Sequence, residues 1–92
     1  MIVRILGEGQ FRLSAYWLDE LNALDAQAVD AVARGEAGEL RRVLEEMEAL
    51  VRREGQPVPA HELVESDVVL PSPDMALEEA RAIFTGEGLV PG

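Results

Sequence analysis

The chain contains no cysteine, which excludes disulfide bonds, thiolate chemistry and cysteine-based metal sites. No apolar run approaches the roughly 18 residues needed to cross a bilayer. The first residues lack the basic lead and the long apolar region of a secretory signal. We therefore expect a cytoplasmic protein that does not insert directly into a membrane and reaches one only peripherally, through a partner.

Basic residues are scarce: 8 stand against 18 acidic residues, and the formal net charge is −10 over 92 residues. A surface this negative repels nucleic acid and anionic lipid head groups. It favours a basic protein partner, or serves solubility alone. A chain of this length makes one small domain, which we assign to residues 1–92.

Residue patterns typical of catalysis are also missing. The single histidine, His61, has too few nitrogen, sulfur or regularly spaced oxygen ligands around it for a zinc or calcium site. The serines lack the surroundings of a nucleophile elbow. The sequence thus predicts no catalytic residue, no metal ligand and no cofactor, and we expect a protein that is not an enzyme.

The strongest positive signal is a helical pattern in residues 39–54. Its apolar residues recur at the spacing of one helix face: Leu40, Val43, Leu44, Met47, Leu50 and Val51. A second stripe predicts a helix over residues 15–34, with Ser14 as its N-cap and Gly35 at its end. Because the connection is short, the two helices should form an antiparallel helical hairpin. Such a hairpin can form the chain's own core, self-associate as a homodimer, or accept a partner helix.

Residues 2–13 predict a β-hairpin, since two strand-like segments flank the glycine-containing stretch 7–9. A three-residue loop at 7–9 would pair apolar residues on one face and place Arg4 opposite Arg12 on the other. Like charges at opposing positions repel each other. We therefore expect a carboxylate beside these two arginines, from this chain or from a partner.

The remaining chain predicts shorter elements. Residues 57–59 should be extended, and residues 68–70 should form a short third strand that can join the hairpin sheet. Residues 74–85 predict a short helix, capped by Asp74 or Ser72 and ended by residues 86–88. Leu89 and Val90 are apolar enough to fold back on the domain. The predicted class is therefore α+β.

Four residues near the hairpin are our candidates for contact with a partner. Arg4 and Arg12 carry charge on the more polar face of the hairpin, and Tyr16 and Trp17 add aromatic character at the start of the first helix. Tyr16 also falls off the apolar stripe, so it is either exposed or packed on the hairpin.

Several segments, taken in order along the chain, resemble the PspA-associated PspAA family. They are residues 1–11, 18–25, 66–71, 77–79 and 87–92. The resemblance implies a small, non-enzymatic companion that binds or regulates PspA, the phage-shock membrane-stress protein of the ESCRT-III-like class. It brings no catalytic residue with it. An acidic domain with helical surfaces is consistent with a basic, helical, membrane-bound partner, and a homodimeric structural domain is the alternative.

Overall fold

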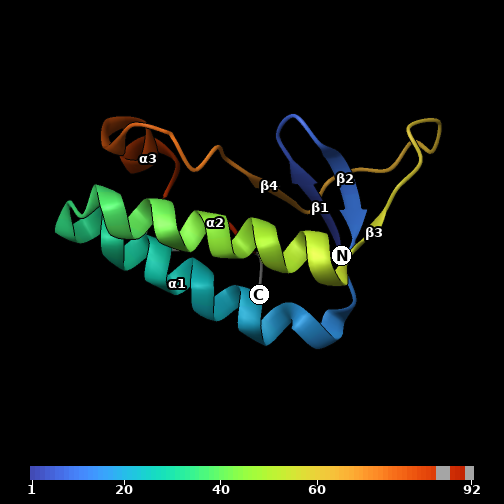
Figure 1. Ribbon diagram of the computed structural model, residues 1–92, viewed down its shortest axis with the longest axis horizontal. Helices are drawn as coiled ribbons and strands as arrows, with labels where there is room; N and C mark the ends of the chain where they lie inside the picture. Colours follow the sequence, from blue (N-terminus) through green and yellow to red (C-terminus); the bar gives the residue numbers. More distant parts are fainter. Residues whose placement is uncertain (85–87, 91–92) are drawn as a thin grey trace.

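The computed structural model describes residues 1–84 and 88–90. Two long antiparallel helices lie side by side, with a four-stranded sheet over one end of the pair and a short helix over the other (Figure 1). The α+β class, the N-terminal hairpin and the helical hairpin are confirmed.

The helical hairpin consists of α1 (Leu18–Arg34) and α2 (Ala37–Glu54), with the 3₁₀ turn η1 (Ala15–Trp17) ahead of α1. The Ser14 hydroxyl accepts a hydrogen bond from the Tyr16 backbone N–H at 3.2 Å, so the predicted cap is confirmed on η1. Gly35 ends α1 in the left-handed region, at φ 71°. All six stripe residues of α2 are at most 2 % exposed, which places that stripe in the chain's own core.

The sheet has the strand order β3-β2-β1-β4. Its strands are β1 (Ile2–Ile5), β2 (Gly9–Arg12), β3 (Gln56–Pro57) and β4 (Val68–Leu70). The predicted strand at 68–70 is confirmed as β4, which joins β1 in parallel. The sequence did not predict β3, which pairs with β2. Pro57 is compatible with this edge position, where a strand needs fewer backbone donors.

The predicted hairpin register is wrong. Arg4 lies opposite Gln10, and Arg12 lies opposite Ile2, so the two arginines are not paired. They nevertheless share a face of the sheet, because the loop is still odd in length. They are diagonal neighbours, a relationship that separates residues by about 7–8 Å. The expected repulsion between them is correspondingly weaker.

The register differs because the turn begins one residue earlier than predicted. The strands close at Ile5 and Gly9, and the Glu8 N–H donates to the Ile5 carbonyl at 2.9 Å. Gly7, at φ 85°, supplies the left-handed residue inside this turn. The prediction kept Leu6 in the strand as an apolar residue, but the structure leaves it 56 % exposed in the loop.

The last helix, α3, spans Leu77–Ile83, and Ala76 is its N-cap. The predicted caps Asp74 and Ser72 are wrong. The Ser72 hydroxyl instead accepts a hydrogen bond from the Asp74 N–H at 3.2 Å, which forms a separate turn before the helix. The prediction that Gly86 helps to end the helix lies outside the described residues.

The tail at residues 88–90 folds back on α1. Val90 is 6 % exposed and belongs to the hydrophobic core, and Leu89 packs against that core. The buried Asp25 carboxylate accepts hydrogen bonds from the Leu89 N–H at 2.9 Å and from the Val90 N–H at 2.7 Å. The end of the described chain is therefore attached by both apolar burial and charge-assisted hydrogen bonds.

Within the described chain, none of the helices is both long enough and apolar enough to cross a bilayer.

Candidate functional site

The four predicted contact residues come from three elements, β1, β2 and η1. Arg4 and Arg12 lie on the outer face of the sheet, and Tyr16 and Trp17 form the 3₁₀ turn that leads into α1. The sequence placed all four near the hairpin. In the structure they make two surfaces, one on the sheet and one at the start of α1.

The outer sheet face arises from the alternation of β1 and β4. Val3, Ile5 and the two ends of β4 point into the core. Arg4 therefore points outward, and its partner across the β1–β4 ladder is Val69, which is 46 % exposed. The result is an exposed arginine beside an exposed apolar residue on a sheet face.

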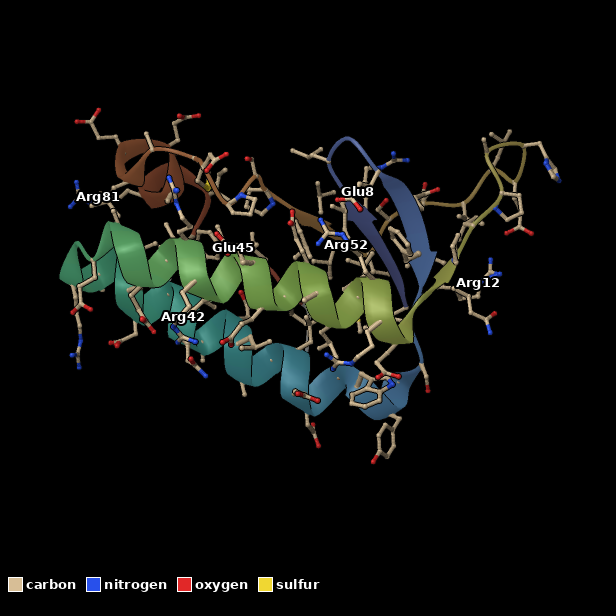
Figure 2. The ribbon with its side chains drawn as sticks, in the orientation of Figure 1. Glu8, Arg12, Arg42, Glu45, Arg52 and Arg81 are labelled. Atoms are coloured by element: carbon tan, nitrogen blue, oxygen red, sulfur yellow. The ribbon has the colours of Figure 1, made fainter. Side chains whose placement is uncertain are left out.

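Arg12 has the carboxylate partner that the sequence led us to expect. Its guanidinium Nη2 lies 2.9 Å from Glu62 Oε2, in the loop that follows β3. Figure 2 labels Arg12. Both side chains are about half exposed, so the pair adds little stability. Its main effect is to hold Arg12 against the loop.

Arg4 forms no ion pair with any residue in the described part of the chain. It borders a hollow of about 280 Å³ that is also lined by Glu8, Gln10 and residues 57–60. The Gln10 amide Nε2 donates to the Val64 carbonyl at 2.9 Å and to the Ser66 hydroxyl at 2.8 Å, which ties the loop to the sheet beside this hollow. Arg4 thus offers a charged group with all its donors available to a ligand or partner.

The aromatic pair forms the second surface. Tyr16 is 80 % exposed, and its ring stands edge-on to Trp17, with the centroids 5.0 Å apart and the planes at 86°. Trp17 is half-buried and packs against the core. An exposed tyrosine supported by an anchored tryptophan resembles the residues that dominate protein interfaces.

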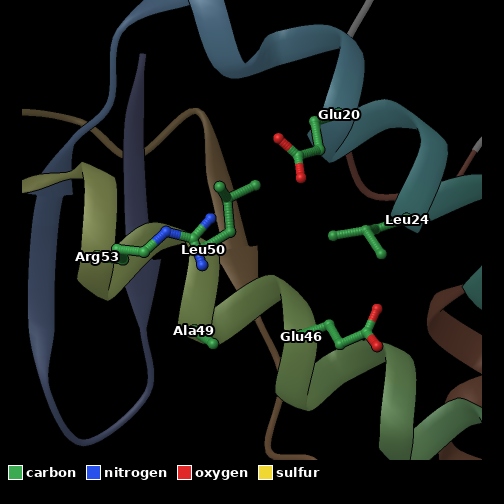
Figure 3. A pocket seen from close by; sticks show the side chains of 6 residues that line it. All are labelled: Glu20, Leu24, Glu46, Ala49, Leu50 and Arg53. Atoms are coloured by element: carbon green, nitrogen blue, oxygen red, sulfur yellow. The ribbon is translucent and has the colours of Figure 1, made fainter.

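A third feature, which the sequence did not predict, is a groove between α1 and α2 (Figure 3). Its volume is about 200 Å³, and its lining residues come from both helices: Glu20, Leu24, Glu46, Ala49, Leu50 and Arg53. The lining residues follow helical spacing on each helix. Finding the groove from sequence would have required the packing register of the two helices as well as their stripes.

Glu8 in the hairpin turn is joined to α2 by Arg52. Arg52 Nε lies 2.7 Å from Glu8 Oε1, and a second bond links its Nη2 to Glu8 Oε2 (Figure 2). Arg52 also contacts Glu48 one turn earlier at 3.1 Å, at the i, i+4 spacing that favours such pairs on a helix. The hydrogen bonds from Arg52 lower the pKa of the Glu8 carboxyl. This bidentate pair fixes the turn over α2.

Side chains that bind metal ions do not cluster in the described part of the chain. Among residues 1–84 and 88–90, no group of three or more His, Asp or Glu side chains is placed to hold a metal ion. His61 is exposed in the loop after β3.

Comparison with known proteins gives one match. The model of a family described as PspA-associated protein matches residues 1–92, the entire chain. No curated protein and no solved structure matches it. With a family match over its whole length, this chain belongs to the PspA-associated protein family.

Proposed function

We propose that this protein is a non-enzymatic adaptor or regulator that binds a PspA-type membrane-stress protein. The observation that carries the proposal is the family match over the whole chain. The surfaces support it, because the exposed arginine and tyrosine side chains belong to types that are frequent at interfaces. In this proposal the protein works in the cytoplasm, next to the membrane through PspA.

The contact residues we propose remain Arg4, Arg12, Tyr16 and Trp17. Arg4 and Tyr16 are the strongest of the four, because each exposes its polar group. Arg12 would first have to release or share Glu62. Trp17 would act chiefly by supporting the Tyr16 ring.

The test is binding of the purified protein to PspA from the same organism, by isothermal titration calorimetry at low and at high salt. We expect binding at low salt that weakens as salt rises, since exposed charges are screened. A complete lack of binding at low salt would overturn the proposal.

A homodimer that pairs through its helical hairpin is the alternative. The α2 stripe is already buried within one chain, so a dimer would have to use the outer faces of the helices. Light scattering distinguishes the two: a monomer at high concentration removes the dimer, whereas a dimer that does not bind PspA would replace the adaptor proposal.

A further inference from the structure

The groove between α1 and α2 has an apolar floor. Leu24 is 9 % exposed and Leu50 is 2 % exposed, and both line the groove together with Ala49. One helical turn before Glu46 on α2, Arg42 Nη2 donates to Gln27 Oε1 across the two helices at 3.3 Å. At its N-terminal end α1 leads back to η1 with its two aromatic residues.

The rim of the groove carries two carboxylates from opposite helices. Figure 3 shows Glu20 on α1 and Glu46 on α2 reaching into the space on either side of Leu24. Glu20 makes no ion pair with the described residues, and Glu46 shares Arg42 with Glu39. Both carboxylates keep acceptor positions available, since an ionised carboxylate has about four.

A long basic side chain matches this combination of surfaces. Lysine and arginine lay their methylene stems on apolar surface and keep the charged group at its polar edge. Here the stem would lie over Leu24 and Ala49, and the charged group would reach Glu20 and Glu46. The net charge of −10 attracts a basic partner to this acidic domain from a distance.

We propose that this groove receives a lysine or arginine side chain presented by a helix of the protein partner. The proposal rests on the proposed function, because it names the chemistry of the PspA-type protein's contact. We expect the partner segment to be a helix, because the groove lies between α1 and α2 and a third helix can pack against both of them.

Arg53 provides a test of the proposal, because its substitution should change the affinity for the partner in the opposite direction to substitution of Glu20. It lines the groove and is paired with its neighbour Glu54 at 2.8 Å. A basic side chain entering the groove is repelled by Arg53 and attracted by Glu20. Substitution of these two residues should therefore change affinity in opposite directions. In a dimer that joined Arg53 of one copy to Glu20 of the other, both substitutions would weaken association.

The experiment measures the affinity of full-length variants for PspA from the same organism. Glu20→Lys should weaken binding about tenfold, and Arg53→Glu should strengthen it severalfold. Asp19→Lys is the control for Glu20, because both acids lie in the first turn of α1. Arg34→Glu is the control for Arg53, because each arginine lies in the last turn of its helix. Both controls should change binding by less than about twofold.

The outcomes separate this proposal from the adaptor function. If the wild-type protein does not bind PspA, the adaptor proposal and the groove proposal are both wrong. If it binds but the groove variants behave like their controls, or if Arg53→Glu weakens binding, only the groove proposal is wrong. Circular dichroism checks that each variant is folded, and Glu20→Gln replaces Glu20→Lys if the latter is not. Glu20→Gln should still weaken binding about threefold.

Discussion

Asp25 on α1 lies directly against the backbone of Gly88, which is 63 residues further along the chain. A Cβ atom added at Gly88 would come within 2.8 Å of the Asp25 Cγ. The close approach lets the carboxylate accept the N–H groups of the next two residues, Leu89 and Val90. Gly88 is therefore fixed by two independent requirements, a left-handed φ of 76° and the lack of a side chain.

Replacing Gly88 should destabilise the fold more than replacing a glycine that has only the conformational requirement. We expect Gly88→Ala to lower the free energy of unfolding by about 2–3 kcal/mol, because it adds a clash with Asp25 to the cost of a left-handed alanine. Gly9→Ala is the matched control. Gly9 has φ 96° with nothing within 4 Å of an added Cβ, so it should cost about 1–2 kcal/mol. Urea unfolding measures both, and equal losses would contradict the clash.

Removal of the Asp25 carboxylate should release the tail. Asp25→Ala leaves the buried Val90 N–H without its acceptor, at a cost of about 1–3 kcal/mol. The measurement is urea unfolding together with hydrogen exchange of the Val90 amide, which should lose its protection. Asp30→Ala on the same helix is the control, because its exposed pair with Arg34 is worth well under about 1 kcal/mol. Unchanged exchange at Val90 in Asp25→Ala would show that apolar burial alone holds the tail.

Asp25 also shows where the sequence was informative and where it was not. The residue lies among Leu21, Ala28 and Val32 on the apolar face of α1, and a carboxylate in such a position must find donors. The identity of the donors could not be predicted, because they come from a segment more than sixty residues away with no periodic pattern of its own.

The helices were predictable because their spacing repeats over many residues, so a single exception does not change the pattern. The sheet was less predictable from the sequence than the helices. The hairpin register depended on whether Leu6 belongs to the strand or to the turn, and an apolar side chain alone does not decide that. The strand β3 has two residues, one of them Pro57, and owes its pairing to the position of β2. In the candidate site, the exposure of Arg4 and Tyr16 could be predicted, because both residues lie off the apolar faces of their elements. The groove between the two helices could not be predicted without the tertiary structure.

The ion pair between Glu8 and Arg52 should make the pKa of Glu8 depend on Arg52. Hydrogen bonds from Arg52 lower this pKa below its ordinary value of 4.5. A lowered pKa in the folded state means that the stabilisation is complete above the unfolded-state pKa and is lost as the pH falls through the folded-state value. In Arg52→Gln the Glu8 pKa should rise towards 4.5, as measured by NMR titration of the carboxyl carbon. The Glu39 pKa, which is lowered by Arg42, should stay low in this variant, and a parallel rise in both would indicate a general loss of structure.

Tyr16 and Trp17 should respond differently to truncation, although they are neighbours in one turn. Tyr16 is 80 % exposed, so Tyr16→Ala should change the free energy of unfolding by less than about 0.5–1 kcal/mol. Trp17→Ala should cost more, about 2–3 kcal/mol, because Trp17 packs against the core.

If the aromatic surface contacts PspA, Tyr16→Ala should weaken that binding about tenfold or more, as truncation of an interface tyrosine commonly does. Thermal unfolding of the Tyr16→Ala variant measures its stability, and calorimetric titration of the same variant measures its affinity for PspA. A Tyr16→Ala protein with full stability and full affinity would leave Arg4, on the outer face of the sheet, as the candidate contact to test next.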